Sequence, residues 1–240
     1  MSITATSIVR DLAVEIPGAT RVFEGLGIDY CCGGNHPLTH ACSKAGLAVE
    51  DVVSKLEDAN RAAIKTDEDR DWRAEPLTAL VSHILATHHA FDRGELARIE
   101  PLLAKVVSVY QETHPELIEI QTIFTAMKLD LLNHMAKEEQ VLFPYIVELQ
   151  ETVGRGEDKP IPFFGTVRNP VRMMMTEHDT VGDMLKSMRQ LSSNFTVPSD
   201  ACVSYSALYE ALAGLESDLH KHIHLENNLL FPRVIEMEGN

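Results

Sequence analysis

Two segments of the chain carry a histidine followed four residues later by a glutamate. The first pair is His134 and Glu138, and the second is His222 and Glu226. Each pair is followed at the same distance by Leu-Phe-Pro, and the two copies are 88 residues apart. Residues four apart lie on one face of a helix, so each copy would present an imidazole and a carboxylate to the same place.

In both segments the pair falls within an apolar stripe of helical spacing. A buried carboxylate without partners is costly, so two of them at such positions need partners. One pair alone would favour an ordinary hydrogen-bonded pair in a core. Two matched copies, with a further histidine on each of the other two helical stretches, favour a dinuclear metal site instead. In such a site each carboxylate can bridge both ions, and the four imidazoles divide two to each ion. Histidine and carboxylate ligands without a thiolate suit iron or manganese, and zinc fits as well.

The sequence has four long helical stretches, and the two that lack a His-Glu pair each supply one further histidine. His178 is in phase with the apolar residues of the third stretch. The first stretch is ambiguous, because its early part, residues 77–84, puts His88 in phase and its later part, residues 96–103, puts His89 in phase. His89 and His178 are 89 residues apart, which repeats the spacing of the paired motifs.

The arrangement of elements follows from these stretches. Prolines mark helix starts, a Gly- and Pro-rich segment at 154–169 reads as a loop, and no stretch has the alternation of a strand. The prediction is an all-α protein with a small N-terminal helical domain and an antiparallel four-helix bundle. We expect the N-terminal domain at 1–63, a polar linker at 64–75 and the bundle at 76–240.

Composition excludes several classes of partner. The chain has 240 residues with 36 acidic and 21 basic side chains, a formal charge of −15. This charge argues against nucleic-acid and anionic-membrane partners. The sequence shows neither a secretory signal pattern nor an apolar stretch of the ~18 residues that a membrane span needs. Four cysteines in a chain of this length indicate a reducing compartment, so we expect a cytoplasmic protein.

The spacing of the motif distinguishes between families of di-iron bundle. Ferritin-like bundles use Glu-x-x-His, which does not occur in this sequence. The alternation of His with His-x3-Glu resembles the hemerythrin-like bundle instead. Residues 27–34 read Gly-Ile-Asp-Tyr-Cys-Cys-Gly-Gly, and Asp71-Trp72-Arg73 precedes Pro76-Leu77. Both segments resemble the iron-sulfur cluster repair di-iron proteins, the RIC family, and the resemblance covers essentially the whole chain.

The resemblance implies a ligand set for two iron ions, and it selects His89 over His88. The implied metal ligands are His89, His134, Glu138, His178, His222 and Glu226. Six protein ligands for two irons, against seven in oxygen-carrying hemerythrins, leave coordination positions open to NO, dioxygen or water. Open positions also favour loss of the metal.

The resemblance further implies a cytoplasmic protein, made under nitrosative or oxidative stress, that repairs iron-sulfur clusters by donating iron. Its partners would be damaged iron-sulfur proteins, and a non-turnover iron donor fits better than an enzyme. Two alternatives stay open. One is a di-iron oxidoreductase acting on NO, nitrite or peroxide, and the other is a hemerythrin-like carrier or sensor of NO or dioxygen. The oligomeric state, a homodimer included, also stays open.

Cys31 and Cys32 are the candidate residues for a thiol or transfer role. Adjacent Cα atoms lie ~3.8 Å apart, below the ~4.4 Å of normal disulfides, so we expect two thiols. The following glycines predict an exposed, reactive turn.

Other polar residues near the motifs fit roles outside the ligand set. Asp130 and Glu177 fit either a support for the ligands, an acidic exit path or a solvated face. His220 and His224 are expected to face solvent, because they lie two residues on either side of His222.

Overall fold

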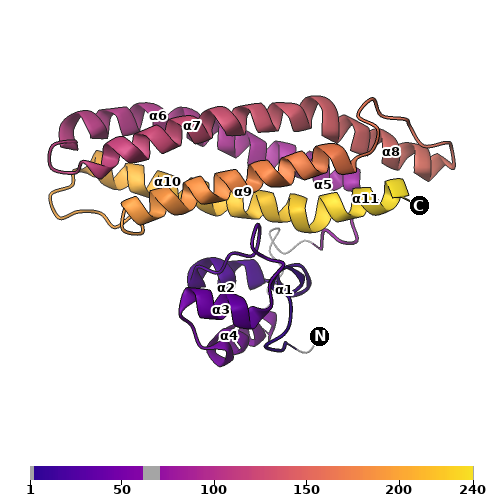
Figure 1. The fold of residues 1–240 in the computed structure, drawn as a ribbon, viewed down its shortest axis with the longest axis horizontal. Helices are drawn as coiled ribbons and strands as arrows, with labels where there is room; N and C mark the ends of the chain where they lie inside the picture. Colours follow the sequence, from indigo (N-terminus) through magenta and orange to yellow (C-terminus); the bar gives the residue numbers. More distant parts are fainter. Residues whose placement is uncertain (1–2, 62–70, 240) are drawn as a thin grey trace. The chain divides into compact units, whose positions relative to one another are not determined.

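The computed structural model describes residues 3–61 and 71–239 (Figure 1). Within these residues the regular structure is helical, and an isolated β-bridge joins Ile8 and Pro37. The predicted all-α class is therefore confirmed. Most of the expected linker at 64–75 lies outside the described residues.

The chain divides into two compact units. The first combines Met1–Pro76 with His220–Arg233, and the second combines Leu77–Leu219 with Val234–Asn240. The division falls inside helix α10 (Val203–Leu225), which runs through it without a break.

In residues 3–61, the described N-terminal part of the first unit, four short helices pack together. Their core contains Leu12, Phe23, Leu38 and Leu56, all fully buried. The helices are α1 (Val9–Glu15), α2 (Ala19–Leu26), α3 (Leu38–Ala45) and α4 (Val49–Arg61).

The Cys-Cys turn lies between α2 and α3, and its neighbours explain its shape. The Asp29 carboxylate accepts hydrogen bonds from the backbone N–H groups of Cys32 at 3.0 Å and Gly33 at 2.9 Å. This is the local side-chain-to-backbone bonding that Asp favours in turns. Gly34 follows because any Cβ there would lie 2.5 Å from the carbonyl oxygen of Tyr30. The residues around the cysteine pair therefore build a tight turn.

Four long helical rods run alternately up and down to form the bundle (Figure 1). Helix α7 packs against both α6 and α9, and residues of α10 share the same apolar core. In chain order the rods are α5 (Leu77–His83), η2 (Ile84–His89) and α6 (Ala90–Tyr110); α7 (Glu116–Lys137), η3 (Glu138–Leu142) and α8 (Phe143–Arg155); α9 (Arg168–Leu191); and α10, η4 (Glu226–Leu230) and α11 (Phe231–Gly239).

Three of the rods contain a π-helical turn, labelled η. In η3 the backbone N–H of Phe143 donates to the carbonyl of Glu138, five residues earlier. The following Pro144 lacks an N–H, and its ring would clash with the carbonyl four residues before it in a regular α-helix. The wider turn removes that conflict, and η4 precedes Pro232 in the same way. At these two prolines the helix is thus widened locally.

Candidate metal centre

The six side chains implied as ligands come from all four rods and are buried. Each is no more than 3% exposed. Three of them stand at π-helical turns: His89 is the last residue of η2, Glu138 is the first of η3, and Glu226 is the first of η4. His134 and His222 lie one turn before the two glutamates, and His178 lies within α9.

Potential ligand atoms of these side chains gather into two overlapping groups, within each of which they lie no more than 4.8 Å apart. Each group has two histidines, and both groups contain the same two glutamates. The first group is His89, Glu138, His222 and Glu226, and the second is His134, Glu138, His178 and Glu226. The structure therefore brings together all six residues that the sequence singled out.

The two carboxylate oxygens of Glu138 face different histidines. Oε2 lies 3.4 Å from His89 Nε2, and Oε1 lies 3.3 Å from His134 Nε2. His134 Nε2 also lies 3.0 Å from His178 Nε2, so two ring nitrogens point at each other. Four imidazoles and two carboxylates, with no thiolate, form a donor set that suits iron or manganese.

Glu139 supports the outer nitrogen of His89. Its Oε1 lies 2.8 Å from His89 Nδ1, and the same carboxylate accepts hydrogen bonds from Arg93 at 2.9 and 3.0 Å. Burial acts to raise the pKa of Glu139, but the hydrogen bonds from Arg93 and His89 outweigh it and hold the pKa below its usual value. A carboxylate at Nδ1 fixes the ring so that Nε2 is left for the metal.

Glu177 does the same for His134 from the neighbouring rod. Its Oε2 lies 2.7 Å from His134 Nδ1, and Lys137 forms an ion pair with it. Burial acts to raise the pKa of Glu177. The hydrogen bonds from Lys137 and His134 outweigh burial and hold the pKa below its usual value. Glu177 therefore lies in contact with a candidate ligand, and support of a ligand was one of the roles expected for it. Asp130, in contrast, is exposed.

The sequence reasoning missed Glu139 and Arg93. A signal was present, because Arg93 stands one helical turn after His89 and Glu139 directly follows Glu138. An acidic residue next to one ligand and a basic residue one turn from another are common on solvated faces. Only the folded structure shows that Arg93 and Glu139 contact each other.

Helix η2 explains why the first stretch had two phases. A π-helical turn inserts one residue, so the apolar stripe before it and the stripe after it are offset by one position. Both His88 and His89 are consequently buried, at 4% and 2% exposure. His88 Nδ1 lies 2.9 Å from Asp218 Oδ2, and His88 is in neither ligand group.

Cys31 and Cys32 are free thiols, as expected, but the turn is less open than the sequence suggested. Cys31 is buried at 7% exposure, so the expectation of an exposed pair is wrong for this residue. Its Sγ lies 3.9 Å from Cys32 Sγ. The hydrogen bond to Cys32 and burial raise the pKa of Cys31 well above its usual value. Cys32 is half-buried and is therefore the more accessible thiol.

His224 does not face solvent, which corrects a second expectation. It is 5% exposed, its Nδ1 lies 2.9 Å from Asn228 Nδ2, and burial lowers its pKa to about 4. The reason is that His220–Arg233 belongs to the same compact unit as Met1–Pro76. Helical phase alone treats every outward position of a bundle as solvated.

Across the described ranges, we find no helix that is both long enough and apolar enough to span a membrane.

Comparisons with known proteins divide the chain in two. Residues 5–60 match the ScdA_N family, described as a domain of unknown function (DUF542), and residues 79–234 match the hemerythrin HHE cation binding domain. A protein of Haemophilus influenzae named "Probable iron-sulfur cluster repair protein" is 33% identical over 95% of this chain and 96% of its own length. The "Iron-sulfur cluster repair protein YtfE" of Yersinia pseudotuberculosis is 36% identical, and that of Musicola paradisiaca 34%, over the same shares.

Proposed function

This chain belongs to the family of iron-sulfur cluster repair proteins with a hemerythrin HHE domain, and we propose that it repairs damaged clusters by donating iron from a di-iron centre. The observation that carries the proposal is the pair of overlapping ligand groups that share Glu138 and Glu226. Two groups that share two carboxylates suit a pair of neighbouring ions.

In this proposal the two glutamates would hold both ions, and two imidazoles would hold each ion. His89 and His222 serve one ion, and His134 and His178 serve the other, as the two groups suggest. Iron bound there would supply Lewis acidity and one-electron chemistry. Glu139 and Glu177 hold the rings of His89 and His134 in the orientation that leaves Nε2 free for the metal.

Iron donation is supported by the small number of protein ligands. Six side chains for two ions leave positions that a competing ligand can take, so an ion can leave in steps. A structural metal site, by contrast, fills the coordination shell with protein atoms. We expect damaged iron-sulfur proteins as the partners and the cytoplasm as the location.

Cys31 and Cys32 are proposed to act in transfer and not in retention. Neither belongs to a ligand group. Cys32, the more accessible thiol, is the better candidate for first contact with iron or with a partner. The hydrogen bond to Cys32 and burial raise the pKa of Cys31, so Cys31 is the less ready of the two to form a thiolate.

The test uses isotopically labelled iron. The full chain is loaded with ⁵⁷Fe and mixed with a [4Fe–4S] dehydratase whose cluster has been damaged by NO. We expect dehydratase activity to return together with ⁵⁷Fe in the repaired cluster, and the Glu138→Leu variant to restore neither. Recovery of activity without label in the cluster would contradict donation and leave repair by another route.

One observation favours a second candidate function. The same open positions on two buried ions suit binding of NO, dioxygen or peroxide. Steady-state consumption of NO, nitrite or peroxide with a chemical reductant would identify an oxidoreductase. Reversible binding without consumption would identify a carrier or sensor.

A further inference from the structure

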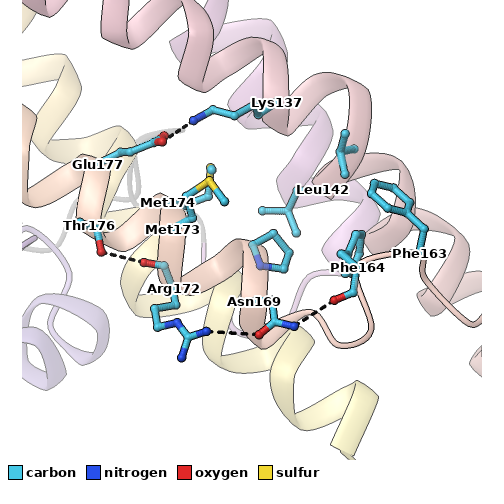
Figure 2. A pocket seen from close by; sticks show the side chains of 12 residues that line it. Lys137, Leu142, Phe163, Phe164, Asn169, Arg172, Met173, Met174, Thr176 and Glu177 are labelled. Carbon is cyan, nitrogen blue, oxygen red and sulfur yellow. Dashed lines mark hydrogen bonds and ion pairs between the residues drawn. The ribbon is translucent and has the colours of Figure 1, made fainter.

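A largely apolar pocket lies in the second unit beside the metal centre. Its volume is about 690 Å³, and its walls come from the end of α7, from η3, from α9 and from the loop that precedes α9. Figure 2 shows Leu142, Met174 and Phe164 around it. Pockets of roughly 300–1,000 Å³ with apolar walls and a few polar groups are typical small-molecule sites.

The loop wall is fixed in place, so the pocket is preformed. The Phe164 ring packs edge-on against Tyr145 with centroids 5.1 Å apart, and its carbonyl accepts a hydrogen bond from Asn169 at 2.9 Å. Glu238 accepts hydrogen bonds from the Tyr145 hydroxyl at 2.7 Å and from the Val167 backbone N–H at 2.8 Å. A preformed pocket spares a ligand the entropy of ordering its site.

Two large apolar side chains of the lining remain exposed. Phe163 is 89% exposed and Met173 is 52% exposed. One exposed apolar residue is ordinary, but two on the lining of one apolar pocket form a surface that a bound molecule would cover. An occupant with an apolar body fits these walls.

The charged side chains of the pocket favour an anion. Lys137 and Arg172 line it together with a single acid, Glu177. Lys137 and Glu177 form an ion pair, and Arg172 is bonded to Asn169 (Figure 2). The ammonium of Lys137 has three donors, so it can hold Glu177 and a second acceptor at once. A net positive lining is notable in a chain of charge −15.

Glu177 connects the pocket to the metal centre. Glu177 lines the pocket and accepts a hydrogen bond from His134 Nδ1 at 2.7 Å. Met174 stands one helical turn before His178 on the same helix. Two residues, Lys137 and Glu177, therefore connect a molecule that contacts Lys137 to the candidate ligand His134.

We propose that this pocket binds a small molecule with an apolar body and an anionic head, and that its occupancy is transmitted to His134 through Lys137 and Glu177. The second half of this proposal rests on the proposed metal centre, and the first half does not. Twelve residues line the pocket, fewer than the ~20–30 on each side of a stable protein interface, and this favours a small molecule over a protein partner.

Binding is tested by calorimetric titration of 1-anilinonaphthalene-8-sulfonate into the full metal-loaded chain. We expect one saturable site. Thr176→Trp, which fills the pocket, is expected to abolish this binding, whereas Thr180→Trp, one turn further along the same exposed face of α9, keeps it. Equal affinities of the two variants for the probe would overturn the assignment of the binding site to this pocket. Circular dichroism checks that both variants keep their helices.

The anionic head is tested with a matched neutral probe. N-phenyl-1-naphthylamine has the same aromatic body without the sulfonate, and we expect it to bind about fivefold more weakly. Arg172→Glu is expected to weaken only the sulfonate probe, with Lys186→Glu on the same helix as the control. Equal affinity for the two probes would overturn the anionic head.

Transmission to the centre has its own readout. The visible absorption of the iron-loaded chain is recorded with and without saturating sulfonate probe. We expect a shift of the iron bands in the parent chain and none in Thr176→Trp. An unchanged spectrum with the probe bound would refute transmission. Because binding itself is measured by calorimetry, its failure is distinct from failure of iron donation.

Discussion

Replacing Glu139 by glutamine tests whether the hydrogen bond at His89 Nδ1 strengthens metal binding at the centre. The substitution keeps an oxygen that can accept from His89 Nδ1, now at 2.8 Å, and removes the negative charge. It also breaks the ion pair with Arg93. The imidazole then loses its charged acceptor, and Nε2 becomes a weaker donor to a metal ion.

The expected magnitude follows from the strength of this bond. A charge-assisted hydrogen bond is roughly twice as strong as a neutral one, which contributes ~1 kcal/mol. Losing the charge should therefore weaken metal binding by ~1–1.5 kcal/mol, or about tenfold. Glu139→Ala removes the acceptor entirely and should approach a hundredfold.

The affinity is measured by competition for Co²⁺ against a coloured chelator. Glu95→Gln is the matched control, because Glu95 has a similar ion pair with Arg98 on the bundle surface and is in neither ligand group. We expect the control to bind like the parent chain. Equal affinities for Glu139→Gln and Glu95→Gln would refute the support assigned to Glu139.

Three further predictions concern the ligands and the thiols. Glu138→Leu should lose both ions and not one, measured as metal per chain, because a bridging carboxylate serves the pair; retention of two ions would exclude bridging. His89→Leu should alter the iron absorption bands while His88→Leu leaves them nearly unchanged, and the opposite result would reverse the assignment. The double variant Cys31→Ala/Cys32→Ala should keep two irons yet repair a damaged cluster enzyme more slowly; loss of iron would make the thiols ligands.

Much of the bundle could be predicted from sequence because helical spacing records which face is buried. In the third stretch, the residues at alternating 3-and-4 spacing are all buried, from Val171 to Met188 with His178 among them. The matched pairs in the second and fourth stretches likewise lie at the centre of the bundle. A repeat with fixed spacing predicts a site well, since each position follows from the helix alone.

The π-helical turns could not be read from the same pattern. They shift the stripe by one residue, so Leu142 is buried where constant phase selects Val141. The change of helical phase that made both His88 and His89 candidates is the effect of such a turn on the sequence pattern. Proline after Leu-Phe marks two of the three turns, and η2 has no such marker.

Packing against other parts of the chain accounts for the remaining errors. The glycine-flanked turn looked open, but Cys31 is buried within its own unit. His224 looked solvated by phase, but it belongs to that unit as well. Contacts between residues nearly 200 positions apart leave no periodic signal in a single sequence.

The metal content of the purified chain, with its Mössbauer spectrum, tests the central claim most directly. The account predicts two irons per chain in a magnetically coupled pair with nitrogen and oxygen ligands, and loss of both in Glu138→Leu. A single iron per chain, uncoupled irons, or full occupation by zinc would contradict it.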